Sequence, residues 1–447
     1  MNASPSIQEV VRNDLCIACG ACIPACPYSN ISPAFSMKRG AHEVAISDPT
    51  RCSDCAQPCD AVCPSIRVDF VRQLHARDGS HDADNEDSLP TRDGWMQAIH
   101  LAWSPKFQAD GVSSSGGVTR AILANSLKNG TPVVCLAWDA DRSDYSPRRL
   151  ESLRDIDLVP GSIYHSTTFV GALDLIRSAE DPVVLIAIPC QLSGLLQYIA
   201  NHEHSLAKKI GLVVGIVCGW MYSHHAVKAF AQFIGSEQPD VTKTTYRGGD
   251  RVGKLVVRSR GKDQSFDRRK FQSQREAINY QSSFSRDMNR LRCRMCQDHL
   301  NLAADIVVGD AWLSRNSDKK SIVACRTSRG EAALSELVRA NALKLEPSSL
   351  QDILESQSPN LVYGQDARRM SAFFHAAGKI APSFGYRDAD DIPEITMADA
   401  CNIRLELFRR WVARRHYATY RLIYILRQRL LRLSGRLSRF IARARRK

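Results

Sequence analysis

The sequence has no long apolar segment. Its longest apolar run, Ile210 to Tyr222, is shorter than the ~18 residues that a membrane-spanning helix needs. The first residues also lack a basic stretch followed by an apolar core, so no secretory signal peptide is visible. With 447 residues, 44% of them hydrophobic and 24% charged, the chain has the composition of a globular protein of two or three domains. The sequence therefore favours a cytoplasmic location.

Acidic residues are almost missing from the C-terminal segment. From Cys401 onward there are fifteen Lys or Arg residues and one acid, Glu406, whereas the rest of the chain carries 45 basic and 46 acidic residues. The net charge of +13 thus resides in the tail, and the body is close to neutral. Because a nucleic-acid-binding body would carry its own positive charge, we expect no nucleic acid among the partners.

Cysteine, by contrast, is abundant: there are fifteen, and eight of them lie in the first 63 residues. Disulfides do not persist in the cytoplasm, so clustered cysteines there indicate metal binding or catalysis. The first four have the C-x2-C-x2-C-x3-C-P spacing of bacterial ferredoxins, and the next four repeat it with one extra residue in the middle gap. These cysteines are Cys16, Cys19, Cys22 and Cys26, then Cys52, Cys55, Cys59 and Cys63.

In such a run the fourth cysteine lies too far along the chain to join its neighbours and serves the other cluster. The spacing therefore predicts two 4Fe-4S clusters, held by Cys16, Cys19, Cys22 and Cys63 and by Cys52, Cys55, Cys59 and Cys26. A pair of zinc knuckles is the alternative, but zinc requires neither the proline after the fourth ligand nor the crossed pairing. We expect a two-cluster, ferredoxin-type domain over residues 1–72.

An acidic linker and a glycine-rich helix start follow. The polar stretch 73–93 has few apolar residues and predicts a solvated linker to the body. In the body, Ser113-Ser114-Ser115-Gly116-Gly117-Val118 precedes a helical pattern over 119–128. We expect Ser115 to cap this helix and leave backbone N–H groups free for an anion such as a flavin pyrophosphate. Taken alone, such a helix start is structural about as often as it is functional.

Two short apolar runs, 183–188 and 212–217, predict buried parallel strands. Cys190 and Cys218 come directly after them. In an open α/β sheet, ligands bind at the edge formed by the carboxyl ends of the strands. We therefore expect these two thiols to lie close together at a ligand-binding edge.

A C-x2-C pair, Cys293 and Cys296, brings the number of thiols in the body motifs to four. Four thiolates suit a third 4Fe-4S cluster, a zinc site, or two buried cysteines beside a redox pair, and the spacing leaves these possibilities open. The cysteines outside every motif are expected to be core or surface thiols; they are Cys135, Cys325 and Cys401.

Five motifs occur in the order found in a known family. They are Ser114-Ser115-Gly116-Gly117-Val118, Ile188-Pro189-Cys190-Gln191, Cys218-Gly219, Arg292-Cys293-x2-Cys296-x-Asp298 and Ala304-Asp305-Ile306-x2-Gly309-Asp310. In them the chain resembles the coenzyme F(420) hydrogenase/dehydrogenase beta-subunit family, over about residues 1–345. The resemblance implies an α/β fold in which a ferredoxin-like domain with two 4Fe-4S clusters precedes an α/β flavin- and iron–sulfur-binding body at 94–345.

The resemblance also implies site residues. It implies that a third 4Fe-4S cluster is held by Cys190, Cys218, Cys293 and Cys296. It also implies that FAD contacts Ser114, Ser115, Gly116 and Gly117. Arg247 and Lys254 are candidates for contact with a phosphate or a flavin carbonyl, although a solvated turn is an equal alternative. Asp305 and Asp310 flank a predicted strand, and we expect supporting or turn roles for them.

Clusters move single electrons, whereas a flavin can hold two and deliver them as a hydride. We therefore expect an iron–sulfur flavoprotein oxidoreductase that exchanges electrons with a redox protein and a hydride equivalent with a small substrate or carrier. The alternative is an electron-transfer subunit of a larger redox complex, with no substrate site of its own. No motif identifies the substrate or indicates a deazaflavin.

The C-terminal region divides into an extension without an assigned role, 346–400, and a basic tail, 401–447. Apolar residues of the tail recur in steps of three and four, which puts them on one face of a helix; they are Ile423, Leu426, Leu430, Leu433, Leu437 and Phe440. A basic amphipathic helix lies in the interface of an anionic membrane. We expect peripheral attachment to the inner face of the membrane, with packing on the body or on a partner subunit as the alternative.

Overall fold

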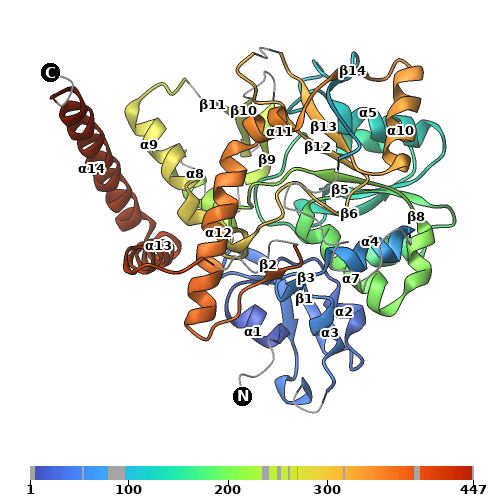
Figure 1. The fold of residues 1–447 in the computed structure, drawn as a ribbon, viewed down its shortest axis with the longest axis horizontal. Helices are drawn as coiled ribbons and strands as arrows, with labels where there is room; N and C mark the ends of the chain where they lie inside the picture. Colours follow the sequence, from blue (N-terminus) through green and yellow to red (C-terminus); the bar gives the residue numbers. More distant parts are fainter. Residues whose placement is uncertain are drawn as a thin grey trace.

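In the computed structural model, a large mixed sheet occupies the centre of the molecule, the N-terminal part lies on one side of it, and a long C-terminal helix extends to another side (Figure 1). The residues that the structure describes are 6–52, 55–78, 96–233, 241–248, 253–259, 262–268, 270–315, 318–386 and 393–444.

The N-terminal part is built from short helices around one antiparallel hairpin. Its first helix is capped by Ser6, whose hydroxyl accepts a hydrogen bond from the N–H of Glu9 at 3.3 Å. The eight cysteines lie on the short helices and on the loops beside them: Cys22 begins α2 and Cys59 lies in α3. The elements are α1 (Ile7–Arg12), α2 (Cys22–Ala25), β1 (Ile31–Ser36), β2 (Ala41–Ile46), α3 (Pro58–Ala61), β3 (Arg67–Val68) and α4 (Phe70–Asp78).

The central sheet has eight strands in the order β14-β4-β13-β12-β8-β7-β5-β6. The neighbours from β12 to β5 are parallel, and the outer pairs are antiparallel. The two predicted parallel strands are confirmed as β7 and β8, which lie side by side. The strands are β4 (Ala98–Trp103), β5 (Val133–Asp139), β6 (Asp144–Leu150), β7 (Val183–Ala187), β8 (Ile210–Ile216), β12 (Ile306–Asp310), β13 (Ser321–Cys325) and β14 (Lys344–Pro347).

Both faces of this sheet are covered, which explains why β7 is apolar at every position. Alternate residues of β7 belong to different cores: Leu185 joins one that includes α7, and Ile186 joins one that includes α5 and α10. The first core also contains residues of the N-terminal part, so that part packs directly on the sheet. The covering helices are α5 (Val118–Lys128), α6 (Ala172–Arg177), α7 (Pro189–His202) and α10 (Ser328–Arg339).

A smaller antiparallel sheet and two helices form a side layer with its own aromatic core, centred on Phe230 and Tyr246. These elements are α8 (His224–Phe233), β9 (Val241–Gly248), β10 (Lys254–Ser259), β11 (Lys262–Asp267) and α9 (Gln274–Ser283).

The predicted linker begins too early in the sequence. α4 continues to Asp78, and Arg77 is buried in an ion pair with Asp305 at 2.5 Å. This pair connects the N-terminal part to the central sheet, so residues 73–78 belong to the folded protein. The rest of the predicted linker, from residue 79, lies outside the described residues.

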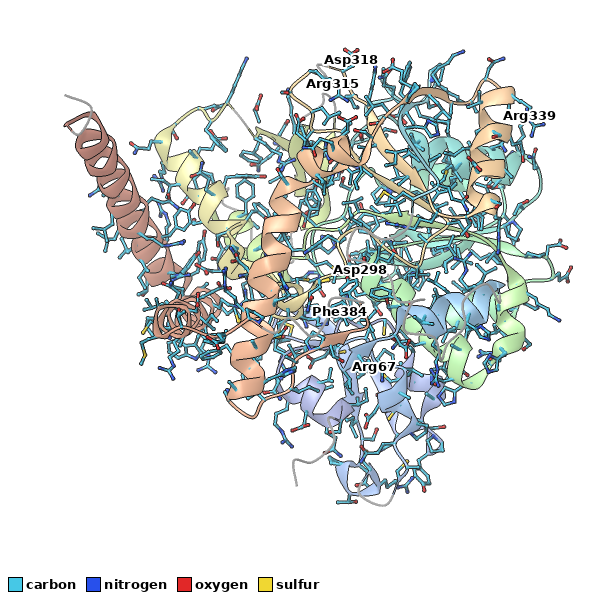
Figure 2. All side chains as sticks on the ribbon, viewed as in Figure 1. Arg67, Asp298, Arg315, Asp318, Arg339 and Phe384 are labelled. Carbon is cyan, nitrogen blue, oxygen red and sulfur yellow. The ribbon has the colours of Figure 1, made fainter. Side chains whose placement is uncertain are left out.

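The extension 346–400 returns to the N-terminal part. Its strand β15 (Ser383–Phe384) pairs in parallel with β3, with Phe384 opposite Val68; Figure 2 labels Phe384 and Arg67 at this junction. The extension therefore fastens the N-terminal part to the body. Its helices are α11 (Leu350–Ser356) and α12 (Ser358–Ala376).

The basic tail is helical and its first half is docked on the body. α13 (Met397–Arg415) buries Arg410, which donates to the carbonyl of Asn289, and Arg414 pairs with Asp14 at 2.6 Å. α14 (Tyr417–Ala444) begins with Tyr420 buried in a core beside α8. Among the described residues, no helix combines the length and the apolar character that crossing a bilayer requires.

Candidate functional site

Four buried cysteines of the N-terminal part surround one cavity; we call Cys16, Cys19, Cys22 and Cys63 the middle quartet. The first three thiols can converge from one short loop because Ala18 and Gly20 adopt left-handed φ angles of 52° and 86°. Burial, reinforced by the neighbouring thiols, raises the pKa of Cys22 and Cys63 well above the usual value.

A second cavity is lined by Cys26, Cys52, Cys55 and Cys59, the outer quartet. Three of these thiols are half-buried, and Cys59 is buried. The backbone N–H of Asn30 donates to the sulfur of Cys26 at 3.4 Å, and that of Gln57 donates to Cys55 at 3.3 Å. Hydrogen bonds to sulfur of this kind are among the features that tune iron–sulfur clusters.

The grouping in the structure has the crossed form that the spacing predicts. Cys63 lies with the first run and Cys26 lies with the second. The assignment of each group to a 4Fe-4S cluster stays a prediction.

The four cysteines of the body converge as well; we call Cys190, Cys218, Cys293 and Cys296 the inner quartet. Cys190 lies in the first turn of α7 and Cys218 follows β8, while the other two belong to the turn at 292–296. Because β7 and β8 are adjacent and parallel, their carboxyl ends meet. Burial, and then the nearby thiols of the quartet, raise the pKa of Cys190 and Cys218 well above the usual value.

The inner and middle quartets are in close contact. A Cβ atom at Gly194 of α7 would lie 2.6 Å from the sulfur of Cys19, so only glycine fits there. Cys19 in turn influences the pKa of Cys190 through its charge. Likewise, the charge of Cys59 of the outer quartet raises the pKa of Cys22 of the middle quartet. The quartets thus follow one another in the order outer, middle, inner.

Two buried arginines lie at the junction of the middle and inner quartets. Arg290 donates to the carbonyl of Cys16 at 2.7 Å, and Arg292 donates to that of Pro64 at 2.7 Å. Within the described part of the chain, Nε and Nη1 of both guanidinium groups lack hydrogen-bond partners. A buried cation with unused donors is costly unless an anion lies beside it. For Arg290 that anion is the carboxylate of Asp14, 3.3 Å from Nη2. For Arg292 a negatively charged iron–sulfur cluster held by the cysteines would meet this requirement.

A large cavity of about 280 Å³ opens at the carboxyl ends of β7, β8 and β12. Its wall includes Cys218 of the inner quartet and the start of α5. This is the ligand-binding edge that the strand pattern predicts. The inner quartet therefore lies between the middle quartet and this cavity.

The start of α5 differs from the expectation for Ser115. Its hydroxyl does not cap the helix; it donates to the carbonyl of Lys320 at 2.7 Å, because β13 begins beside it. The N-cap residue is Gly117, with a φ of 75° and no side-chain cap. Residues of this first turn, Val118 to Arg120, line the cavity, and no side chain caps the start of the helix, so the anion site stays a prediction.

The other predicted flavin contacts divide between the cavity and the frame around it. Ser114, Ser115 and Gly117 line the cavity, whereas Gly116 packs against the backbone carbonyl of Ala102. Ser114 is also tied to the opposite wall, since its hydroxyl lies 2.7 Å from that of Ser162.

Arg247 and Lys254 have different environments. Arg247 lines the cavity, pairs with Asp310 and donates to the carbonyl of Ser114 at 2.6 Å. Lys254 is exposed at the first residue of β10 and is not among the residues that line the cavity. The carboxylate of Asp305 accepts one hydrogen bond from Arg77 and another from the N–H of Val213, the latter at 2.7 Å. These bonds agree with the supporting role expected for Asp305.

Gln191, part of the Pro-Cys-Gln motif, has no role predicted from sequence. Its side chain is buried and lines the cavity. The amide Nε2 has no hydrogen-bond partner among the described residues, although Oε1 accepts from the N–H of Ile188 at 3.5 Å. An unused donor in the wall fits the carbonyl oxygen of a bound ligand such as a flavin. The adjacency of Gln191 to Cys190 is the signal that could have identified it.

Comparisons with known proteins give one match in the body of the chain and one in its N-terminal part. Residues 181–350 match the family described as the C terminus of the coenzyme F420 hydrogenase/dehydrogenase beta subunit, and residues 15–66 match the 4Fe-4S dicluster domain. The chain is 25% identical over 258 residues to a subunit of the F(420)H(2) dehydrogenase of Methanosarcina mazei, covering 55% of this chain and 65% of that protein.

Over 361 residues the chain is 23% identical to the coenzyme F420-dependent sulfite reductase of Methanocaldococcus jannaschii, covering 76% of this chain and 48% of that protein. The chain thus spans less than two thirds of the length of either curated relative. A chain of the F420-reducing [NiFe] hydrogenase complex of Methanosarcina barkeri aligns with a TM-score of 0.47 and 17% identity, covering 63% of this chain and 94% of that one.

Proposed function

Because the chain belongs to the coenzyme F420 hydrogenase/dehydrogenase beta-subunit family and carries an N-terminal 4Fe-4S dicluster domain, we propose that it moves electrons through three 4Fe-4S clusters to a flavin in the large cavity. The observation that carries this proposal is the order of the cysteine groups. Outer, middle and inner quartets follow one another, and Cys218 of the inner quartet borders the cavity.

In this proposal the three quartets hold the clusters and differ in their access to partners. The outer quartet has three half-buried thiols and lines a cavity of its own, so an external redox protein would exchange electrons there. The middle quartet is buried, and its Cys19 packs against Gly194 of α7, the helix that carries Cys190 of the inner quartet. Arg290 and Arg292 would balance the negative charge of the two clusters at that contact.

The cavity residues would bind and orient a flavin of the FAD type. A bound flavin would supply the exchange between one-electron and two-electron chemistry. The first turn of α5 offers backbone N–H groups to a pyrophosphate, and the unused amide of Gln191 offers a donor to a carbonyl. Arg247, fixed by Asp310, would keep a positive charge in the same wall.

A deazaflavin of the F420 type is the first two-electron partner to test, because both curated relatives carry F420 in their names. The second candidate function is that of an electron-transfer subunit within a larger redox complex. The half-buried outer quartet is compatible with both candidates, since a cluster near the surface can receive electrons from a separate redox protein or from a partner subunit.

The test uses the full chain purified without air. We expect about twelve irons for three clusters of four, one FAD, and reduction of F420 when a reduced ferredoxin supplies electrons. Turnover only in the presence of a partner protein, with all cofactors bound, would favour the role within a larger complex. Zinc in place of iron, or a cavity without flavin, would contradict the proposal.

For the tail, we infer a peripheral attachment to anionic membrane on its cytoplasmic side. The structure changes the predicted stripe, because Ile423 packs against the body and the exposed apolar residues described on α14 are Leu422, Leu426 and Leu430. In α13, Leu405, Phe408 and Trp411 are exposed as well. The side chains of Leu433, Leu437 and Phe440 lie outside the described part. Exposed leucines among arginines suit the interface of an anionic bilayer, where each basic group contributes on the order of 1 kcal/mol.

Vesicle binding tests this attachment. The full chain should sediment with vesicles that contain phosphatidylserine and be released by high salt. Combined Leu422→Gln, Leu426→Gln and Leu430→Gln should weaken binding, whereas Met37→Gln, at another exposed apolar residue, should not. Equal sedimentation of the triple variant and the unmodified chain would contradict the attachment.

A further inference from the structure

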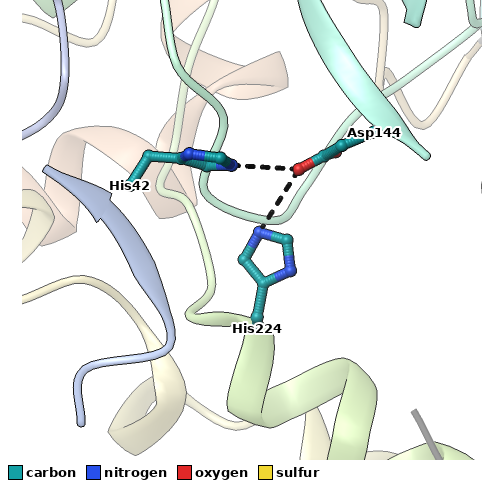
Figure 3. A group of neighbouring side chains, drawn as sticks. All are labelled: His42, Asp144 and His224. Carbon is teal, nitrogen blue, oxygen red and sulfur yellow. Dashed lines mark hydrogen bonds and ion pairs between the residues drawn. The ribbon is translucent and has the colours of Figure 1, made fainter. Parts of the chain in front are cut away.

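Three potential metal ligands from distant parts of the sequence, His42, Asp144 and His224, converge in the structure (Figure 3). Nε2 of His42 lies 3.0 Å from Oδ2 of Asp144, and Nε2 of His224 lies 3.7 Å from the same oxygen. The three ligand atoms all lie within 4.8 Å of one another. Asp144 also contacts His165, which lines the cavity.

The separations fit one small divalent ion. Zinc binds imidazole nitrogen and carboxylate oxygen at about 2.0–2.2 Å, so neighbouring ligand atoms around a tetrahedral ion lie roughly 3.4 Å apart. The observed separations of 3.0 and 3.7 Å lie on either side of this value. The ligand atoms of the two histidines lie within 4.8 Å of each other.

The backbone fixes the positions of the three residues. His42 belongs to the hairpin strand β2, Asp144 is the first residue of β6, and His224 is the first residue of α8. The N–H of His224 donates to the carbonyl of Gly40 in the same hairpin at 2.6 Å. The ligand-bearing elements are therefore already connected, and binding an ion requires little ordering of the chain.

The second oxygen of Asp144 is held by groups that do not compete for the ion. Oδ1 accepts from the N–H of Tyr145 at 2.7 Å and lies 2.8 Å from Nε2 of His165. The other nitrogen of that imidazole, Nδ1, lies 2.8 Å from the hydroxyl of Tyr246. His165 can thus donate to the carboxylate while accepting from Tyr246, an arrangement that orients metal-binding carboxylates in other proteins.

Charge and burial also suit a cation. Asp144 supplies one negative charge among imidazole rings, and the side chains of all three ligands are between 13% and 18% exposed, which leaves a path for an ion. Nε2 of His224 donates to the carbonyl oxygen of Ser166 at 2.8 Å in the metal-free protein, so its proton must leave or move to Nδ1 when the ion binds.

We propose that His42, Asp144 and His224 bind one divalent transition-metal ion, with Zn²⁺ as the representative, and that the ion joins the N-terminal hairpin to β6 and α8. Such a link fixes the dicluster domain against the wall that contains His165. The site uses nitrogen and oxygen ligands, which separates it chemically from the cysteine quartets. It does not depend on the proposed function.

Metal binding to the cluster-loaded full chain tests the site. After brief treatment with a weak chelator, Zn²⁺ is titrated and bound zinc is measured together with iron. We expect one Zn²⁺ per chain, and X-ray absorption at the zinc edge should give a nitrogen and oxygen shell at about 2.0–2.2 Å. A sulfur shell at about 2.3 Å would place the ion on cysteines and overturn the proposal.

Variants assign the ligands. His42→Ala and Asp144→Asn should each weaken binding about 100-fold or more. His165→Ala removes the hydrogen bond that supports Asp144, together with the contacts of this ring to Tyr246 and His224, and should weaken binding about 10- to 100-fold. His202→Ala, at an exposed histidine at the end of α7, is the matched control and should bind like the unmodified chain. Unchanged binding in Asp144→Asn, with iron content intact, would also overturn the proposal.

Discussion

The outer and inner quartets use the same four side chains in different settings. The outer quartet comes from loops and short helical turns within residues 26–59, and three of its thiols are half-buried beside the exposed Arg51. The inner quartet is assembled from two strand ends and a turn spread over residues 190–296, with the buried Arg292 at one side and the large cavity at another.

This difference indicates a division of labour. Loop ligands near the surface make a cluster accessible to a partner, and ligands on the central sheet hold a cluster at a fixed position beside a bound ligand. Under the proposed function, the outer quartet is therefore the point of exchange with a redox protein, and the inner quartet is the obligatory link to the cavity. Each of the following changes separates these two roles.

The largest effect is expected from Cys293→Ala. Loss of one inner ligand should remove about four of twelve irons and abolish flavin reduction by the natural donor, while FAD stays bound. Iron analysis, electron paramagnetic resonance and rapid-mixing absorbance measure these quantities. Cys401→Ala, at an exposed thiol outside the quartets, is the control. Full iron content and unchanged cluster signals in Cys293→Ala would show that the ligand assignment is wrong.

A smaller but clear effect is expected from Gly194→Ala, at the contact of the middle and inner quartets. The added methyl group would lie 2.6 Å from the sulfur of Cys19, so the loop or the helix must move. Overpacking of this kind typically costs about 1–3 kcal/mol of unfolding free energy. We expect a lower melting temperature and slower electron transfer into the inner cluster.

The control for this change is Gly211→Ala in β8, where the nearest atom to the new methyl group would be 3.4 Å away. Equal melting temperatures and equal transfer rates for the two variants would contradict the close contact.

Arg292→Met should change potentials rather than structure. A unit charge roughly 8 Å away in a medium of effective dielectric constant near 20 contributes about 2 kcal/mol, or about 90 mV for one electron. Because removal of a positive charge disfavours the reduced cluster, the potentials of the middle and inner clusters should fall by an amount of this order in a redox titration.

The matched change at the outer quartet is Arg51→Met. Its side chain is 60% exposed, so solvent and salt screen its charge and the shift should be much smaller. A larger shift in Arg51→Met than in Arg292→Met would reverse the comparison.

The smallest effect is expected from Gln191→Leu. Loss of one neutral hydrogen bond is worth about 1 kcal/mol, which corresponds to a roughly fivefold weaker affinity for FAD. Titration of the flavin-free protein measures it. Cluster content should stay unchanged, and an unchanged affinity for FAD would show that the amide does not contact the flavin.

The sequence was informative where function depends on local spacing. The two cysteine runs predict the crossed grouping because three members of each group lie within one loop, and the apolar runs before Cys190 and Cys218 predict the parallel pair β7 and β8. Features made by contacts across the fold were not predictable. Ser115 bonds to Lys320 of a distant strand instead of capping its helix, and Arg77 is buried because Asp305 lies opposite it.

The roles of Gln191 and Arg290 could not be predicted from the sequence for the same reason. Each is notable only because a buried donor lacks a partner in the described part of the fold, a property that depends on neighbours far away in sequence.

Anomalous diffraction at the iron absorption edge, from crystals grown without air, tests the central claim most directly. The account predicts three four-iron centres, within the outer, middle and inner quartets in that order, with the last centre next to the cavity wall at Cys218. Iron in the two N-terminal quartets with none among Cys190, Cys218, Cys293 and Cys296 would contradict it.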